Sequence, residues 1–107
     1  MNPDRVFQAL ADATRRQLLD RLFAENGRTL AALCADLAMT RQAVSKHLAV
    51  LEEAGLVVAV RKGREKLHYL NPVPIQEIAD RWIAKFERGR LRALADLKKQ
   101  LEGDADG

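Results

Sequence analysis

A short stretch of the sequence, residues 41–53, carries side chains that can form hydrogen bonds with nucleic acid on one face of a predicted helix. Arginine, lysine, glutamine and serine are residue types that reach base edges in the DNA major groove or the phosphates beside it. The opposite face is apolar at helical spacing and is predicted to point into a core. His47 lies beside the polar face, and either a phosphate contact or a structural role explains it. The candidate DNA contacts are Thr40, Arg41, Gln42, Ser45, Lys46 and His47.

A second group of cations follows in the segment RKGREK, residues 61–66. The valines before it and the apolar residues after it favour two strands, and Gly63 suits the turn between them. A basic hairpin directly after a pair of helices is typical of a wing that holds the DNA backbone or the adjacent minor groove. The alternative is a solvated hairpin whose charged edges discourage aggregation. The cations assigned to DNA binding in the wing are Lys62, Arg64 and Lys66.

The polar helix needs a partner element to hold it, and the sequence provides one directly before it. Thr29 is predicted to cap a first helix through its hydroxyl group, and Thr40 to cap the second. The turn between the helices is expected at Ala38-Met39, and Gly55 is expected to end the second helix. Residues 29–54 are thus predicted to form a helix-turn-helix that suits insertion into a major groove. On periodicity alone, a helical hairpin with a merely solvated polar face explains the pattern as well.

A long helix is predicted over residues 75–101, after the break Asn71-Pro72-Val73-Pro74. Its apolar residues form a stripe that continues through Leu91, and the rest of the chain has too few apolar residues to cover it. We expect this helix to pack on the first helix of the chain and on a second copy of itself, which gives a homodimer. The alternative is packing within a single chain. The residues predicted at the dimer interface are Val6, Phe7, Trp82, Ile83, Phe86, Leu94, Leu97 and Leu101.

Length and composition limit the remaining possibilities. The 107 residues fit one domain, and 48% hydrophobic residues suffice for a small core. The formal net charge of +3 permits nucleic-acid binding without establishing it. The single cysteine, Cys34, excludes an internal disulfide. No apolar run reaches membrane-spanning length and the N-terminus lacks a secretory signal, so we expect a cytoplasmic protein with no membrane partner.

Three segments together resemble the ArsR/SmtB family of bacterial winged-helix repressors. They are FQALADATRRQLLDRL (7–22), MTRQAVSKHLAVLEEAGLV (39–57) and RKGREKLHYL (61–70). The S-x-H-L piece followed by LEEAGLV is a specific signature in this context, whereas Ala13 departs from the proline that many members carry. The segment WIAKFERGRLRALADLKKQL (82–101) looks like one branch of the family.

The resemblance implies a mainly α (α+β) fold with about five helices and a two-stranded wing. We expect one winged helix-turn-helix domain over residues 1–102, with the wing at 57–70, the dimerisation helix at 75–101 and a flexible tail at 103–107. The resemblance also implies a homodimer, formed through the first and last helices, that represses its own operon. A homodimer with two recognition helices is expected to bind double-stranded DNA at an inverted-repeat operator.

The sequence argues against a metal or other cofactor. Metal-sensing members of the family carry a C-x-C pair at positions that align with Thr29 and Ala31, and neither residue can bind a soft metal. Other members use Asp and His pairs on the last helix, but residues 75–101 contain no histidine. The two histidines and Cys34 do not supply four zinc ligands within one chain. We therefore expect no metal site and no metal dependence.

Three other functions are alternatives to a repressor that senses no metal. A winged helix can serve as a protein-interaction module, but such a module has no need of both a basic wing and a polar recognition face. A repressor could also respond to an unidentified ligand, or to oxidation at Cys34 if its thiolate is accessible. An enzyme is the weakest reading, because the sequence has no catalytic triad pattern, no phosphate-binding glycine loop and no paired acids on an apolar background.

Overall fold

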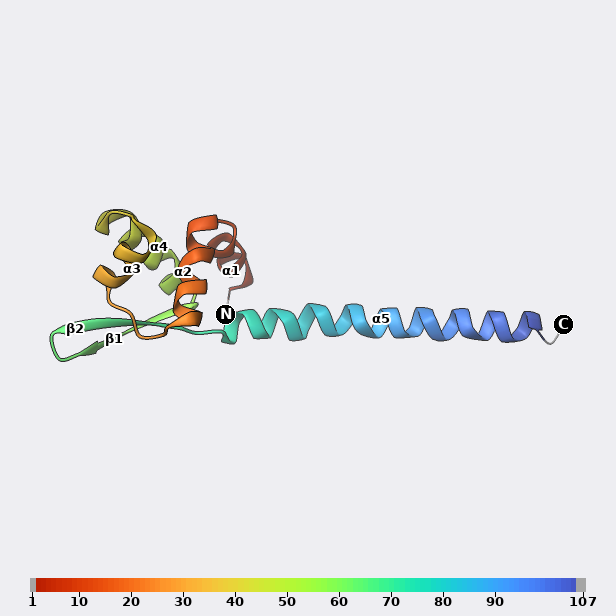
Figure 1. Ribbon diagram of the computed structural model, residues 1–107. Coiled ribbons are helices and arrows are strands. Elements are labelled where there is room, and N and C mark those ends of the chain that lie inside the picture. The colour runs from red at the N-terminus through yellow and green to blue at the C-terminus, as the bar shows by residue number, and fades with distance from the viewer. Residues whose placement is uncertain (1, 106–107) are drawn as a thin grey trace. The chain divides into compact units, whose positions relative to one another are not determined.

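Residues 2–105, which the computed structural model describes, form five α-helices and one antiparallel hairpin (Figure 1). Two compact units divide at Ile75, and α5 supplies nearly all of the second. The winged helix-turn-helix fold expected from the sequence is confirmed. The elements are α1 (Pro3–Leu10), α2 (Ala13–Ala24), α3 (Leu30–Leu37), α4 (Arg41–Glu53), β1 (Val57–Lys62), β2 (Glu65–Leu70) and α5 (Val73–Ala105).

Three helices of the first unit begin at side chains that cap them, and two of these caps, Thr29 and Thr40, are the ones predicted from the sequence. Asp12, Thr29 and Thr40 each accept a hydrogen bond from the backbone N–H three residues later, at 3.0, 3.2 and 3.2 Å respectively. Each bond satisfies one of the free N–H groups of a first helical turn. Gly55, with φ of +79°, lies in the left-handed conformation expected after the end of α4.

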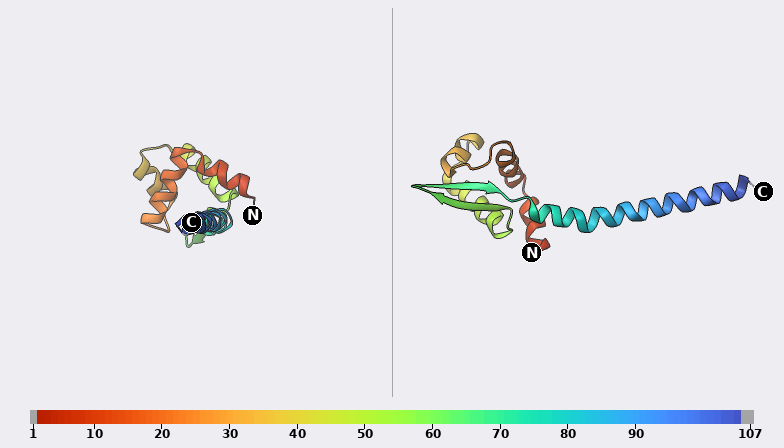
Figure 2. Two further views of the ribbon diagram at one scale, coloured as in Figure 1. Left: turned by 90° about the vertical axis from the view of Figure 1, so that its right-hand side faces the viewer. Right: turned by 90° about the horizontal axis from the view of Figure 1, so that it is seen from below.

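The core of the first unit lies between the helices and one face of the hairpin. Figure 1 shows α1–α4 on one side of the two strands. The turn of the hairpin extends beyond α1–α4, as seen in Figure 1 and in the right-hand view of Figure 2. The strands pair from Val57 opposite Leu70 to Lys62 opposite Glu65. The largest fully buried side chains come from several elements and are Leu18, Leu22, Leu33, Leu51, Leu56, Val6 and Val44.

An ion-pair cluster joins α2, α3 and the loop between them. The Asp36 carboxylate accepts hydrogen bonds from Arg28 Nη2 at 2.6 Å and from Arg21 Nη2 at 3.1 Å. The bond from Arg28 is the main reason that the pKa of Asp36 lies below its ordinary value of 3.8, and the bond from Arg21 lowers it further. The cluster therefore stabilises the fold only while Asp36 is ionised.

This cluster predicts a specific dependence of stability on acid. Because the pKa of Asp36 is lower in the folded chain, its contribution is fully present above the unfolded value near 3.8 and is lost as the pH falls through the folded value. Asp36→Asn should lower the unfolding temperature at neutral pH, and the gap from wild type should close on acidification. Thermal unfolding of both proteins between pH 7 and pH 2.5 measures this difference in unfolding temperature. Asp20→Asn, an equal charge change on an exposed position of α2, serves as the control.

If the difference in unfolding temperature between wild type and Asp36→Asn did not change with pH, the stabilising role given to ionised Asp36 would be contradicted.

The long helix differs from its predicted bounds. It begins at Val73, where the Asn71 side chain accepts a hydrogen bond from the Val73 N–H at 3.3 Å, and it continues to Ala105. The predicted tail at 103–107 is thus wrong for residues 103–105, while residues 106–107 lie outside the described residues. No helix within residues 2–105 combines the length and apolar character needed to span a membrane.

An apolar stripe runs along α5. The sequence pattern placed Leu91 in this stripe, but a helix turns by roughly 100° per residue, so Leu91 lies on about the opposite side of α5 from Trp82. Leu91 is therefore not part of the stripe. The remaining members are between about half and three-quarters exposed in the single chain: Trp82, Ile83, Phe86, Leu94, Leu97 and Leu101. We call these six residues the α5 stripe.

Two residues of α1 were predicted at the same interface, and the structure separates them. Val6 is 0% exposed, so it belongs to the core of its own chain. Its assignment to a dimer interface is wrong, because helical periodicity cannot tell an apolar residue that faces its own core from one that faces a partner. Phe7 is 49% exposed and remains available to a partner.

Candidate nucleic-acid interface

The turn between α3 and α4 fixes the angle at which α4 leaves the core. Ala38 ends α3 in the left-handed conformation, with φ of +52°, which is uncommon for a residue with a side chain. The Met39 N–H donates to the Cys34 carbonyl at 3.2 Å and closes the end of the helix. Leu33 on α3 and Val44 on α4 are both fully buried in the core. One side of α4 is thereby held against the core and the other side faces outward.

The outward side of α4 carries the polar residues predicted from the sequence. Its four candidate base or phosphate contacts are all exposed or partly exposed: Arg41, Gln42, Ser45 and Lys46. Thr40 is also exposed; its oxygen caps α4, and its hydroxyl hydrogen is left to donate. These donors and acceptors are of the kinds that recognise base edges and phosphates.

His47 does not belong to this outward surface. Its Nδ1 lies 3.4 Å from Arg15 Nη1 and 4.0 Å from Asp12 Oδ1, and its side chain is 21% exposed. The ring therefore packs toward the start of α2. Of the two roles considered for His47, this packing favours the structural one, because three residues after Val44 the α4 surface turns toward α2 rather than outward.

The hairpin carries the second predicted group. Gly63, with φ of +65°, makes the turn, and apart from the glycine and its two chain neighbours no atom of the described residues lies within 4 Å of the position a Cβ would occupy. Its neighbours Lys62, Arg64 and Lys66 are all exposed. In the strand register Lys62 lies opposite Glu65, whereas Lys66 lies opposite another cation, Arg61. The positive charge is therefore concentrated in the outer part of the hairpin.

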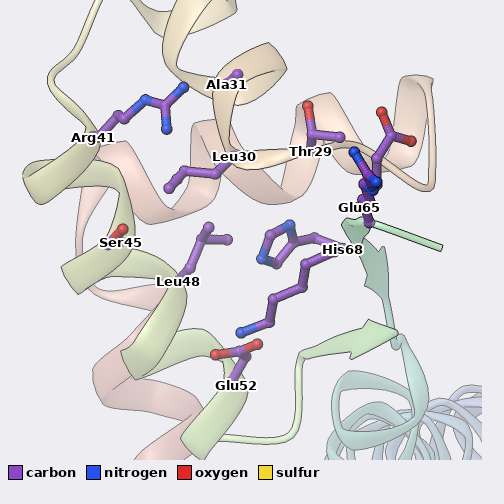
Figure 3. A pocket seen from close by; sticks show the side chains of 11 residues that line it. Thr29, Leu30, Ala31, Arg41, Ser45, Leu48, Glu52, Glu65 and His68 are labelled. Carbon is purple, nitrogen blue, oxygen red and sulfur yellow. The ribbon is translucent and has the colours of Figure 1, made fainter. Parts of the chain in front are cut away.

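A hollow of about 530 Å³ lies between α4, the start of α3 and β2 (Figure 3). Side chains from both candidate groups line it: Arg41 and Ser45 from α4, and Arg64 and Lys66 from the hairpin. Leu30 and Leu48 form an apolar part of its wall. The structure thus brings part of the outward helix face and part of the basic hairpin to one shared surface. Gln42, Lys46 and Lys62 lie outside its lining.

The base of the hairpin contributes a residue that the sequence reasoning did not single out. His68 is 4% exposed, lines the hollow, and is bound to the segment before α3. Its backbone N–H donates to the Arg28 carbonyl at 2.8 Å, and its own carbonyl accepts from Arg28 N–H at 3.1 Å. Alternation along the strand could have indicated this position, because His68 lies on the same face of β2 as Leu70, whose partner in β1, Val57, is buried.

A metal site does not emerge from these side chains. Within residues 2–105, no three His, Cys, Asp or Glu side chains lie close enough together to hold a metal ion. Thr29 and Ala31, which align with a cysteine pair in metal-sensing proteins, both line the hollow. Cys34 is partly buried on α3. The lining of the hollow consists of cations, hydroxyl groups, carboxylates, apolar groups and the His68 imidazole, and it includes no thiol.

Known proteins are similar to this chain in both sequence and fold. A helix-turn-helix domain family matches residues 10–60. The uncharacterized HTH-type transcriptional regulator YuzN of Bacillus subtilis is 44% identical over 88 residues, which span 77% of this chain and 96% of YuzN. An ArsR-like transcriptional regulator from Rhodococcus sp. RHA1 superposes with a TM-score of 0.75 at 32% identity, over 94% of this chain and 90% of that one. The homodimeric winged helix-turn-helix DNA-binding domain of Mb0332 from Mycobacterium bovis, a possible ArsR-family transcriptional regulator, has a TM-score of 0.63 at 29% identity, over 78% of each chain.

Proposed function

This chain belongs to the ArsR family of winged helix-turn-helix transcriptional regulators, and we propose that it is a homodimeric, sequence-specific repressor of its own operon. We further propose that it acts in the cytoplasm and senses no metal. The observation that carries the DNA-binding mode is the shared hollow, which the polar face of α4 and the basic hairpin line together. A duplex lying over this surface would meet both groups at once.

In the proposed complex, α4 enters the major groove and the wing holds the backbone. Gln42, Ser45 and Arg41 are assigned to base edges or to phosphates at the groove edge, and Lys46 and Thr40 to phosphates. Lys62, Arg64 and Lys66 are assigned to the backbone beside the groove. The cations supply sequence-independent affinity, whereas the groups that reach base edges supply the preference for an operator.

The proposed homodimer rests on the α5 stripe. Six large apolar side chains exposed along one helix face would be costly to leave in water. Phe7 of α1 is half-exposed and is assigned to the same interface. The Mb0332 domain, which shares the fold, is a homodimer. A symmetric dimer carries two recognition helices, so the proposed operator is an inverted repeat with half-sites roughly 34–36 Å apart.

Repression is tested by transcription in vitro. The template is the promoter region upstream of the chain's own gene, and the control template carries an unrelated promoter. Purified protein should reduce transcripts from the first template and leave those from the second unchanged. Equal transcription from both templates at saturating protein would contradict autorepression.

Independence from metal is a separate expectation. Thr29 and Ala31 supply no soft ligand, and α5 contains no histidine. Addition of stoichiometric Zn²⁺ to the purified dimer should leave its DNA affinity unchanged, as measured by fluorescence anisotropy with a labelled duplex. Tight stoichiometric zinc binding accompanied by loss of DNA affinity would show that a site forms across the dimer.

A further inference from the structure

The imidazole ring of His68 is held in one orientation by the chain itself. Its Nδ1 lies 2.9 Å from the Arg28 carbonyl oxygen, and the residue is 4% exposed. Because a carbonyl oxygen can only accept a hydrogen bond, Nδ1 must carry a hydrogen atom. In the neutral ring the second nitrogen, Nε2, then has a free lone pair.

That second nitrogen faces the hollow. The ring reaches from β2 toward Leu48, with Glu52 on the neighbouring turn of α4 (Figure 3). Nε2 is not among the buried side-chain atoms of residues 2–105 that lack a partner, so it is accessible from the hollow. A ligand in the hollow can therefore form a hydrogen bond with it in place of water.

Charged side chains around the ring indicate the chemistry of that ligand. The helix α4 contributes Arg41 and Glu52 to the lining of the hollow. The hairpin contributes Arg64, Glu65 and Lys66. The segment before α3 contributes no charge there, only the Arg28 carbonyl that holds the ring and the side chain of Thr29. Three cations against two carboxylates leave an excess of one positive charge. Protonation of His68 would raise this excess to two and convert Nε2 from an acceptor into a donor.

We propose that this hollow is a phosphate-binding site in which protonated His68 donates from Nε2 to a phosphate oxygen. Nδ1–H keeps its bond to the Arg28 carbonyl, so protonation requires no movement of the ring. Arg41, Arg64 and Lys66 supply the surrounding positive charge. The phosphate can come from the DNA backbone, in which case the inference rests on the proposed function, or from a free phosphate ion. A histidine at the base of the wing would then add affinity for phosphate only at lower pH.

His68→Asn separates this role from a structural one. The asparagine amide can still donate to the Arg28 carbonyl in place of Nδ1, but it has no group that replaces Nε2. The measurement is the affinity for a labelled random-sequence duplex at pH 6.0 and pH 8.0 and fixed salt. Wild type should bind about tenfold more tightly at pH 6.0, in line with one charge-assisted hydrogen bond. The His68→Asn variant should lose most of this gain between pH 8.0 and pH 6.0.

His47→Asn is the matched control, because His47 is the other histidine of the chain and its ring packs toward α2. This variant should retain the tenfold gain. If His68→Asn keeps the gain of wild type, or if His47→Asn alone abolishes it, the inference is wrong.

A second measurement needs no variant and identifies the source of the phosphate. The ring-nitrogen NMR signals of His68 are followed while wild-type protein is titrated at pH 6.0 with inorganic phosphate or with the duplex. A shift of Nε2 with both probes supports a site that accepts free phosphate, and a shift with the duplex alone supports a DNA-backbone site. No shift with either probe overturns the inference. If wild type does not bind the duplex at either pH, the proposed DNA-binding function fails, and the inorganic phosphate titration alone decides whether the hollow binds phosphate.

Discussion

A chain carrying Trp82→Glu and Phe86→Glu is expected to be monomeric at micromolar concentration and to bind an inverted-repeat operator at least about 100-fold more weakly than wild type. Trp82 and Phe86 are 48% and 72% exposed in the single chain and lie in the α5 stripe. Carboxylates at these positions would be desolvated without a partner in a dimer. A monomer presents only one recognition helix, and joining two half-site contacts multiplies affinity by roughly 10²–10⁴.

The control for this variant is Leu91→Glu with Ala95→Glu. It adds the same two charges four residues apart on the same helix, at exposed positions on the side away from Trp82. Light scattering should find this control dimeric and the stripe variant monomeric, while circular dichroism verifies that both remain folded. A monomeric wild type, or a stripe variant that remains a dimer, would contradict the proposed interface.

The second large effect is a division of labour between α4 and the wing. Gln42→Ala should cost about 1–3 kcal/mol on the operator, because a glutamine that makes two hydrogen bonds to one base edge supplies that much discrimination. Its effect on random DNA should be much smaller. Arg64→Ala should weaken binding to both DNAs alike, because a contact with phosphate carries no sequence information.

Affinity titrations of both variants on both DNAs, at several salt concentrations, measure this division. Loss of one phosphate contact should reduce the slope of log affinity against log salt by about one for Arg64→Ala and should leave it unchanged for Gln42→Ala. Should Arg64→Ala change the sequence preference while Gln42→Ala weakens every DNA equally, the roles of helix and wing would be reversed.

Much of the fold was predictable because local chemistry determines it. A threonine at the start of a helical pattern predicts an N-terminal cap, and Thr29 and Thr40 both form the caps that the sequence predicts. The spacing of Val44, Leu48 and Leu51 predicted the buried side of α4 correctly. The basic hairpin followed equally from strand-forming residues on both sides of Gly63.

Other features depend on tertiary contacts that local patterns do not encode. The Arg15 Nε donates to the Ala9 carbonyl at 2.9 Å and closes the end of α1, a contact between two helices that local spacing does not predict. The inward turn of His47 depends on where α2 packs against α4. The orientation of the His68 ring depends on residues 40 positions apart, Arg28 and His68, which meet as a short bridge.

Sequence-specific binding is tested most directly by a DNase footprint of wild-type protein on the region upstream of its own gene. Protection is expected over one short inverted repeat with two half-sites about one helical turn apart, centred roughly 34–36 Å from each other. Gln42→Ala should lose this footprint at protein concentrations where Arg64→Ala still shows the same protected bases, only more weakly. Uniform protection without preferred bases, or no protection at saturating protein, would contradict sequence-specific recognition by α4.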